Sequence, residues 1–155
     1  TADNFAKTMS ISCYSFTAVA QAAYPLMKEN GGSMITLTYY GAERVLPNYN
    51  VMGVAKAALE ASVRYLAADL GPDGIRVNSV SAGPMRTLAG SAIGGARKIY
   101  NISEANAPLR QSVSLEQLGG TALYLLSDLG SGVTGETHHV DSGYNIVGMP
   151  YLTGE

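Results

Sequence analysis

The sequence predicts an α/β fold in which a doubly wound parallel sheet carries helices on its faces. Segments with helical periodicity alternate with short, branched, mostly apolar runs, and glycine or proline marks most of the boundaries. This alternation is typical of parallel strands joined by right-handed crossovers. The 155 residues, 46% of them hydrophobic, also suffice for one sizeable core. We therefore expect residues 1–155 to belong to a single domain.

A long helix is expected at the start of the chain, followed by a strand. Apolar residues recur at mixed helical spacings up to Lys28, and either Thr1 or Asp3 can cap the helix. The Gly31-Gly32 pair then ends it. Residues 34–39 are branched and mostly apolar, which predicts a strand that is covered on both faces.

A second helix and a second strand follow. Pro47 suits the first turn of the helix, whose wide apolar face continues to Leu66 before Gly71-Pro72 ends it. Residues 75–80 predict the next strand, and residues 81–84 predict a turn at its carboxyl end.

The remaining chain combines one poorly patterned segment with two clear elements. Residues 85–106 are rich in glycine, alanine and serine and have weak periodicity, so we expect a long mobile loop that carries short helical pieces. Loops of this length are usually functional. Ser114 and Gln117 form a capping-box pattern that opens a helix through Leu126, and residues 137–141 predict the last strand.

Three predicted strands are few for this architecture. The chain also starts with a helix that already needs a sheet to lie on, and a first strand without a neighbour would leave an exposed apolar edge. We therefore expect that a preceding portion, with further strands, is absent from this sequence.

The composition disfavours several classes of function. Charged residues make up 14% of the chain, against roughly 25% in soluble domains, so we expect partner subunits, ligand or missing chain to cover much of the surface. The net charge of -2 and the lack of a basic run longer than Arg97-Lys98 disfavour nucleic acid and anionic lipid. We expect neither a membrane span nor a signal peptide. The one cysteine, Cys13, fits the core of a protein in the reducing cytoplasm.

Tyr49 and Lys56 have a spacing that suits catalysis. On the second expected helix they lie on nearly the same face, two turns apart, near the carboxyl end of the strand at residues 34–39. Ligands bind at that end of open parallel sheets. A phenol there can donate a proton to a developing oxyanion, and an ammonium favours ionised tyrosine and can hydrogen-bond a ribose. By spacing alone, a chance pair remains an alternative.

Longer stretches around this pair are more specific. They are L-T-Y-Y-G-A-E-R at 37–44, P-N-Y-N-V-M-G-V-A-K-A at 47–57, R-V-N at 76–78, S-A-G-P-M-R-T-L-A at 81–89, and G-E through V-D-S-G from 135 to 143. In order and spacing, the chain from Asp3 to about Met149 resembles the enoyl-[acyl-carrier-protein] reductases of bacterial fatty-acid synthesis, within the short-chain dehydrogenase/reductase superfamily.

This resemblance implies a Rossmann-like, three-layer fold and a specific reaction. Such enzymes reduce a trans-2-enoyl thioester on acyl carrier protein with NADH, and NADPH is not excluded here. Hydride adds to the β carbon and leaves an enolate on the thioester. The resemblance implies that Tyr49 hydrogen-bonds the thioester carbonyl and stabilises the enolate. Lys56 would hold the nicotinamide ribose hydroxyls, and Tyr39 would be the second active-site tyrosine. A homotetramer is also implied.

Further contacts are implied by the resemblance. Met52 would lie on the substrate side, and the loop from Leu88 to about Ile99 would close over acyl chain and cofactor. Arg97 and Lys98 match a basic pair that the family uses toward its acidic carrier protein, with a solvated surface pair as the alternative. Beside Lys56, the implied cofactor-binding residues, with the Thr87 hydroxyl and backbone amides as donors, are Ala82, Gly83, Pro84, Met85, Arg86, Thr87, Leu88 and Ala89.

Three other patterns are better explained by structure than by function. Residues 130–135 spell G-x-G-x-x-G, but they follow a helix and precede a strand, the reverse of the order that a dinucleotide fingerprint needs. Tyr24 and Lys28 match the Tyr-x3-Lys pair of classical short-chain dehydrogenases, but they lie before the strand, away from its carboxyl end. His138 and His139 alternate across a strand and so do not suit one metal ion.

Two functional alternatives stay open. One is another short-chain reductase that acts on a 3-oxoacyl thioester or a sugar, although Thr36 and Leu37 stand where classical members have a serine. The other is an inactive fragment or interaction module, if the 155 residues are the whole polypeptide. The family's amino-terminal half, with its glycine-rich turn, has no counterpart here, and cofactor choice depends largely on that half.

Overall fold

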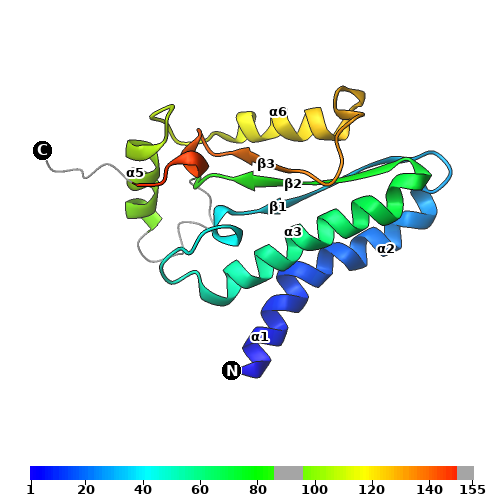
Figure 1. The fold of residues 1–155 in the computed structure, drawn as a ribbon, viewed down its shortest axis with the longest axis horizontal. Coiled ribbons are helices and arrows are strands. Elements are labelled where there is room, and N and C mark those ends of the chain that lie inside the picture. Colours follow the sequence, from blue (N-terminus) through cyan, green and yellow to red (C-terminus); the bar gives the residue numbers. More distant parts are fainter. Residues whose placement is uncertain (86–95, 150–155) are drawn as a thin grey trace, which may run out of the picture.

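The computed structural model describes residues 1–85 and 96–149, which form a three-stranded parallel sheet in the order β1-β2-β3 (Figure 1). Both pairings are parallel, and Leu37 of the first strand lies opposite Val80 of the second. The parallel α/β fold that the sequence predicts is therefore confirmed. The strands are β1 Gly32–Thr38, β2 Ile75–Ala82 and β3 Thr137–Val140.

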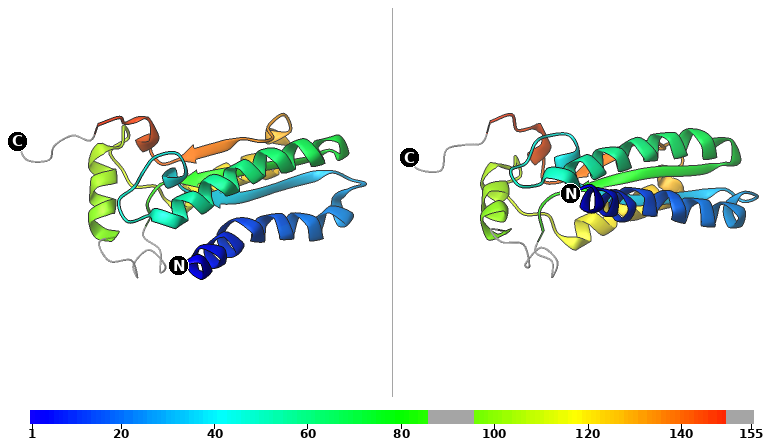
Figure 2. Two further views of the ribbon diagram at one scale, coloured as in Figure 1. Left: turned by 60° about the horizontal axis from the view of Figure 1, so that its bottom comes forward. Right: turned by 90° about the horizontal axis from the view of Figure 1, so that it is seen from below.

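Helices cover both faces of the sheet (Figure 2). α2 and α3 pack side by side on one face, α6 packs on the other, and α5 stands beyond the carboxyl ends of the strands. This arrangement is the doubly wound one, because parallel strands need crossovers that pass over the sheet. The helices are α1 Ala2–Met9, α2 Ser15–Met27, α3 Asn50–Leu70, α5 Ala96–Asn106 and α6 Leu115–Leu126.

A cluster of buried apolar side chains fixes α3 on the sheet. Val63 and Ala67 come from successive turns of α3, and Ile75 and Val77 alternate along β2, so both periodicities point their apolar residues into the same layer. Val63, Ile75 and Val77 have no exposed surface. Because α3 begins beside the candidate site, this packing also holds the site against the strands.

The first helix is interrupted, whereas the sequence predicts one continuous helix. α1 begins after its cap Thr1, whose hydroxyl accepts a hydrogen bond from the Asn4 amide, and a π-helical turn, Ser10–Tyr14, separates α1 from α2. A π turn adds a residue to the helical repeat, which fits the mixed apolar spacing of this segment. The turn buries Cys13, with its Sγ 3.7 Å from Oγ of Ser62, so the expectation that Cys13 lies in the core is confirmed.

β1 forms one edge of the sheet, and its two faces differ in coverage. Met34 and Thr38 are buried under α2 and α3, whereas Leu37, on the opposite face, is 52% exposed. That face meets α6 near Ser33, whose hydroxyl donates to the Leu125 carbonyl at 2.9 Å. The expectation of a strand covered on both faces is therefore wrong at Leu37, and the expected exposed apolar edge is present.

Other boundaries differ from those that the sequence predicts. α3 begins at Asn50 and not in a turn containing Pro47, because Asn48 and Asn50 have positive φ angles of 63° and 36° that break the helical path before it. β2 continues to Ala82, two residues beyond the expected end at 80.

The segment at 85–106 also departs from the expected loop. Residues 96–106 form the regular helix α5, not short helical pieces. Its apolar Ile99 and Ile102 are 46% and 40% exposed, whereas the polar Ser103 and Asn106 are 6% and 3% exposed, so its buried positions include polar residues.

The last helix follows the prediction closely. At the start of α6, the Ser114 hydroxyl accepts from the Gln117 amide at 3.2 Å, and the Gln117 side chain accepts from the Ser114 amide at 2.9 Å. The capping box and the helix end at Leu126 are therefore confirmed. Within residues 1–85 and 96–149, no helix is long and apolar enough to cross a membrane.

Candidate active site

The three parallel strands end at the same side of the sheet, where the candidate site is assembled. β1 ends at Thr38 and is followed by Tyr39, and β2 ends at Ala82, near the end of β3 at Val140. In Figure 1 this is the side on which the first turn of α3 and the helix α5 lie. Ligands of open parallel sheets bind in this position, because loops and helix starts converge there.

Tyr39 and Tyr49 form a ring pair at this edge. Their ring centroids are 5.3 Å apart and the rings meet edge to face at 69°, and both side chains are half-buried. Gly41 makes room for the pair, since a Cβ there would lie 2.4 Å from Cδ1 of Tyr49. Gly53 of α3 lets the same turn approach, because its own Cβ would lie 2.8 Å from the Gly41 carbonyl oxygen.

The backbone holds Tyr49 just ahead of α3. Tyr49 is the N-cap residue of α3, with φ -83° and ψ -24°, and it is flanked by Asn48 and Asn50 with positive φ angles. Tyr49 therefore lies outside the regular helical path, and the expected relation of Tyr49 to Lys56 across two turns of one face stays a prediction. Met52, expected on the substrate side, is half-buried in the first turn of α3.

Lys56 reaches from α3 to the end of β1. Its ammonium donates to the Leu37 carbonyl oxygen at 2.7 Å, and its side chain is half-buried. An ammonium has three donor protons, so two remain for a ligand. Burial lowers the pKa of Lys56, while Glu60 and then Cys13 oppose that shift.

Both phenols of the ring pair stay protonated at neutral pH. Burial, and then the neighbouring Tyr39, raise the pKa of Tyr49 to about 12. Burial also raises the pKa of Tyr39, with smaller effects from Tyr144 and Tyr100. Among the described residues, neither Tyr39 nor Tyr49 has a hydrogen bond to its hydroxyl, so both O–H groups can donate to a ligand.

The chain that follows β2 is described only in part. The Gly83 amide donates to the Val140 carbonyl at 2.8 Å, so Gly83 continues the pairing with β3 and its N–H is already used. A Cβ on Gly83 would lie 2.8 Å from Cα of Asp141, which explains the glycine. Ala82, Pro84 and Met85 are half-buried beside it. The other implied cofactor contacts, Arg86, Thr87, Leu88 and Ala89, lie outside the described residues.

The basic pair at 97–98 lies in the first turn of α5. Lys98 is exposed, and the helix stands beyond the strand ends, on the same side as the tyrosine pair (Figure 1). The expected role of this pair toward an acidic carrier protein stays a prediction.

The competing motif matches have structural roles. The Tyr24 hydroxyl donates to Asp73 at 2.8 Å, and the Lys28 ammonium lies 5.8 Å from the Tyr24 ring centroid, all at the far end of α2 from the tyrosine pair. The G-x-G-x-x-G stretch at 130–135 is the turn between α6 and β3.

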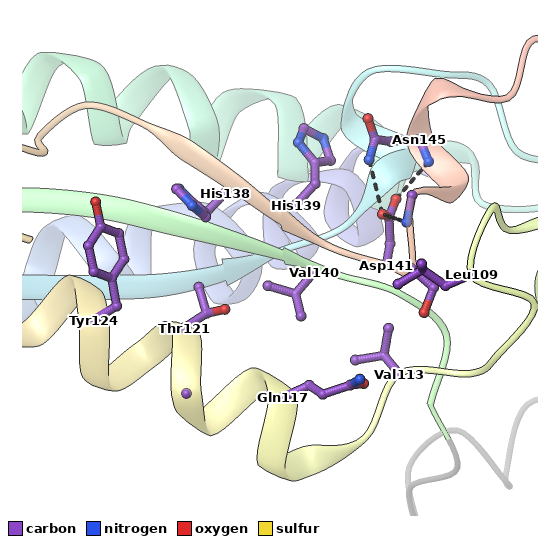
Figure 3. A pocket seen from close by; sticks show the side chains of 13 residues that line it. Leu109, Val113, Gln117, Thr121, Tyr124, His138, His139, Val140, Asp141 and Asn145 are labelled. Atoms are coloured by element: carbon purple, nitrogen blue, oxygen red, sulfur yellow. Dashed lines mark hydrogen bonds between the residues drawn. The ribbon is translucent and has the colours of Figure 1, made fainter.

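The two histidines point to different neighbours. Nε2 of His139 lies 2.6 Å from the Glu43 carboxylate, and the His138 ring lies 5.8 Å from the Tyr124 ring. In the part of the chain that the structure describes, no group of histidine, cysteine and acidic side chains could hold a metal ion. His138, Tyr124 and Asp141 line a cavity of about 560 Å³ between α6 and β3 (Figure 3).

The structure also shows functional candidates that sequence patterns do not reveal. The Thr38 hydroxyl donates to the Glu60 carboxylate at 2.7 Å, and both residues are buried. Asp141 accepts from the Gly143 amide and from the amide and side chain of Asn145, and so orders the turn after β3 (Figure 3). An acidic residue one turn after Lys56 on an apolar helix face is the only signal that could have indicated Glu60.

The sequence and the fold match those of known proteins. A family model described as "Enoyl-(Acyl carrier protein) reductase" matches residues 1–145. The enoyl-[acyl-carrier-protein] reductase [NADH] 1 of Rhizobium meliloti is 69% identical over 147 residues, which are 95% of this chain and 54% of that protein. The chain thus spans about half the length of the curated relatives that it matches.

Solved structures show the same likeness. A crystal structure of the Anaplasma phagocytophilum enoyl-(acyl-carrier-protein) reductase in complex with NAD is 60% identical, with a TM-score of 0.93, over 98% of this chain and 58% of that one. The Bacillus cereus enoyl-acyl carrier protein reductase, solved with NADP+ and indole naphthyridinone, is 56% identical, with a TM-score of 0.93, over 96% and 58%.

Proposed function

Because the chain belongs to the enoyl-(acyl carrier protein) reductase family, we propose that it supplies the catalytic residues that reduce a trans-2-enoyl thioester on acyl carrier protein with NADH. The observation that carries this proposal is the edge-to-face pair of Tyr39 and Tyr49 at the carboxyl edge of a parallel sheet, where the Lys56 ammonium donates to the Leu37 carbonyl two residues before Tyr39. The family relation alone would not identify the site, and the geometry alone would not identify the substrate.

Tyr49 is proposed to stabilise charge on the thioester oxygen. When bound, the reduced nicotinamide supplies the hydride. Reduction at the β carbon of the enoyl group moves negative charge onto the thioester oxygen, and a neutral phenol can donate a hydrogen bond to it. With a pKa of about 12, Tyr49 keeps its proton at neutral pH and needs no rearrangement to donate. Tyr39, in contact with the Tyr49 ring, limits where that ring can lie.

Lys56 is proposed to hold the ribose of the dinucleotide. The donor set fits this group, since one ammonium proton is directed at the Leu37 carbonyl and the others are available for ribose hydroxyls. The main chain at Pro84 and Met85 and the residues 86–89 are the remaining proposed contacts. The Gly83 amide is an exception, because it already pairs with Val140. The Bacillus cereus structure holds NADP+, so the proposed NADH preference needs a direct comparison with NADPH.

The partners and location are proposed on the same basis. Lys98 is exposed in the first turn of α5 beside Arg97, and a basic pair there suits the acidic surface of a carrier protein. Large apolar side chains are exposed on the helices of one face, among them Tyr14 at 58% and Val19 at 63%. Such a surface supports a homotetramer, in which other subunits cover it. A cytoplasmic enzyme that is part of a single Rossmann-like domain completes the proposal.

Two substitutions test the proposed site. The assay uses residues 1–155 alone and as a fusion protein, in which the part of the Rhizobium meliloti relative that the chain does not match precedes them. Tyr49→Phe removes the donor and is expected to lower turnover of an enoyl thioester by about tenfold or more. Lys56→Ala is expected to weaken NADH binding. Circular dichroism checks that both variants keep the fold.

Two matched controls change the same residue types elsewhere. Tyr65→Phe changes a tyrosine of α3 that is 75% exposed, and Lys28→Ala removes the lysine of the competing motif. Both should behave as the unsubstituted protein does. Unchanged kinetics in Tyr49→Phe and Lys56→Ala would refute the site, and faster turnover of a 3-oxoacyl thioester in a parallel assay would refute the substrate.

A further inference from the structure

Two hydrogen bonds join α3 to the end of β1, directly before Tyr39. Lys56 donates to the Leu37 carbonyl, and one helical turn later Glu60 accepts from the Thr38 hydroxyl, each at 2.7 Å. Leu37 and Thr38 are consecutive in the strand, so the two bonds act on adjacent peptide units. We call the pair of Thr38 and Glu60 the clamp.

The clamp is buried, unlike most carboxylate contacts. Thr38 is 4% exposed and Glu60 is 7% exposed. A buried carboxylate is costly unless it is hydrogen-bonded, so its presence here needs a compensating role. Burial raises the pKa of Glu60, and nearby Glu43 adds to the shift. The Thr38 hydrogen bond, Arg64 and His139 act against it.

The clamp closes a loop of contacts that contains every proposed catalytic side chain. Thr38 is covalently joined to Tyr39, whose ring meets Tyr49 at 5.3 Å, and Tyr49 leads directly into α3. α3 then carries Lys56 and Glu60, and Glu60 returns to Thr38. If the clamp opens, the end of β1 can move relative to α3, and the distance between Tyr39 and the other two groups is no longer fixed.

We propose that Thr38 and Glu60 are positioning residues, whose buried hydrogen bond holds the end of β1 against α3 so that Tyr39, Tyr49 and Lys56 face one ligand. The inference rests on the proposed function of these three side chains. It assigns no chemistry to Glu60, which contacts neither the tyrosine rings nor the Lys56 ammonium in any recorded hydrogen bond.

Three variants of the fusion protein separate the hydrogen bond from side-chain size and charge. Thr38→Val keeps the shape and removes the hydroxyl, whereas Thr38→Ser keeps the hydroxyl. Glu60→Gln keeps an acceptor oxygen and removes the charge. The control Thr137→Val breaks another, partly buried contact, the 2.8 Å bond between the hydroxyls of Thr137 and Ser79, which joins β3 to β2 and not α3 to β1.

Turnover, NADH affinity and hydrogen exchange are measured on each variant. Thr38→Val is expected to lower kcat about tenfold and to weaken NADH binding about threefold. The reason is that a small displacement of the proposed catalytic groups lowers the rate strongly. Hydrogen exchange at residues 37–44 should be faster in Thr38→Val than in the unsubstituted protein. Thr38→Ser and Glu60→Gln should stay within about threefold of the unsubstituted protein in kcat. Thr137→Val should lose stability without a change in kcat.

The other outcomes distinguish a failure of the inference from a failure of the proposed function. Equal kcat and NADH affinity in Thr38→Val and Thr38→Ser overturn the inference and leave the proposed function standing. A loss in Thr38→Val that merely matches the loss in Thr137→Val also overturns it. If the unsubstituted fusion protein binds NADH but reduces no enoyl thioester, the proposed function fails, and the NADH affinities and exchange of the Thr38 variants decide the inference. No NADH binding at all overturns both.

Discussion

At the scale of single residues, burial is what prepares the site for its proposed chemistry. It raises the pKa of Tyr49 to about 12 and lowers the pKa of Lys56 from 10.5. The two pKa values shift in opposite directions, because burial disfavours both the anionic phenolate and the cationic ammonium. The lysine is therefore the first of the two groups to lose its proton as the pH rises.

NADH affinity should consequently fall on the alkaline side through Lys56 and not through Tyr49. The ammonium is the form that donates, so binding is retained at neutral pH and is lost as the pH rises through the lowered pKa of Lys56. Titration of NADH binding by fluorescence from pH 7 upward measures this fall in affinity. Lys56→Arg, which stays charged, should not show it. An unchanged alkaline fall in Lys56→Arg would contradict the assignment of the pH dependence to Lys56.

Gly41 should tolerate substitution poorly. In Gly41→Ala the new Cβ would lie 2.4 Å from the Tyr49 ring, so the ring must move and turnover should fall at least about tenfold. Steady-state kinetics of the fusion protein measures the loss. Gly119→Ala is the matched control, because nothing lies within 4 Å of its Cβ and alanine suits the interior of α6. Similar kinetics for the two variants would argue against the importance of the Tyr49 ring position.

At the scale of elements, features that depend on neighbouring residues were predicted well, and features that depend on distant residues were not. The Ser114 capping box, the glycine stop after α2 and the strands all follow from neighbouring residues, so sequence was sufficient. The helix α5 was missed because its buried positions include the polar Ser103 and Asn106, so apolar spacing does not mark its buried face.

The candidate site likewise contains residues that the sequence predicts and a contact that it does not. Tyr39, Tyr49 and Lys56 were predictable because their spacing lies within one strand-to-helix unit and resembles a known pattern. The hydrogen bond of Thr38 to Glu60 was not, since it depends on how α3 is rotated against β1. Rotation of a helix on a sheet is decided by core packing that no local pattern encodes.

α6 should depend on Leu125 for its attachment to the sheet. Leu125 has no exposed surface, so Leu125→Ala is expected to lower the free energy of unfolding by about 2–5 kcal/mol. Leu123, on the same helix, is 66% exposed, and Leu123→Ala should change it by less than about 0.5 kcal/mol. Urea denaturation followed by circular dichroism compares the two. An equally large loss in Leu123→Ala would show that another surface covers Leu123.

At the scale of the whole molecule, the two edges of the sheet differ in what they expose. β1 and β3 are both edge strands of the described sheet, but β1 carries the half-exposed Leu37 directly before the proposed catalytic residues. β3 is short and its residues are all partly buried. The unpaired N–H and C=O groups of an edge strand are a template for further strands. The relatives are nearly twice as long as the matched region, and the fusion protein supplies this additional chain.

The fusion protein should therefore protect β1 selectively. Pairing of an added strand with β1 would bury the backbone amides that do not bond to β2, so hydrogen exchange at residues 32–38 should slow relative to the chain alone. Exchange at residues 137–140, on the opposite edge, serves as the internal control and should change little. The same comparison should show tighter NADH binding, because a fixed β1 also fixes Lys56 through the Leu37 carbonyl. Equal slowing at both edges would mean general stabilisation, and no slowing at β1 would mean that the added part docks elsewhere.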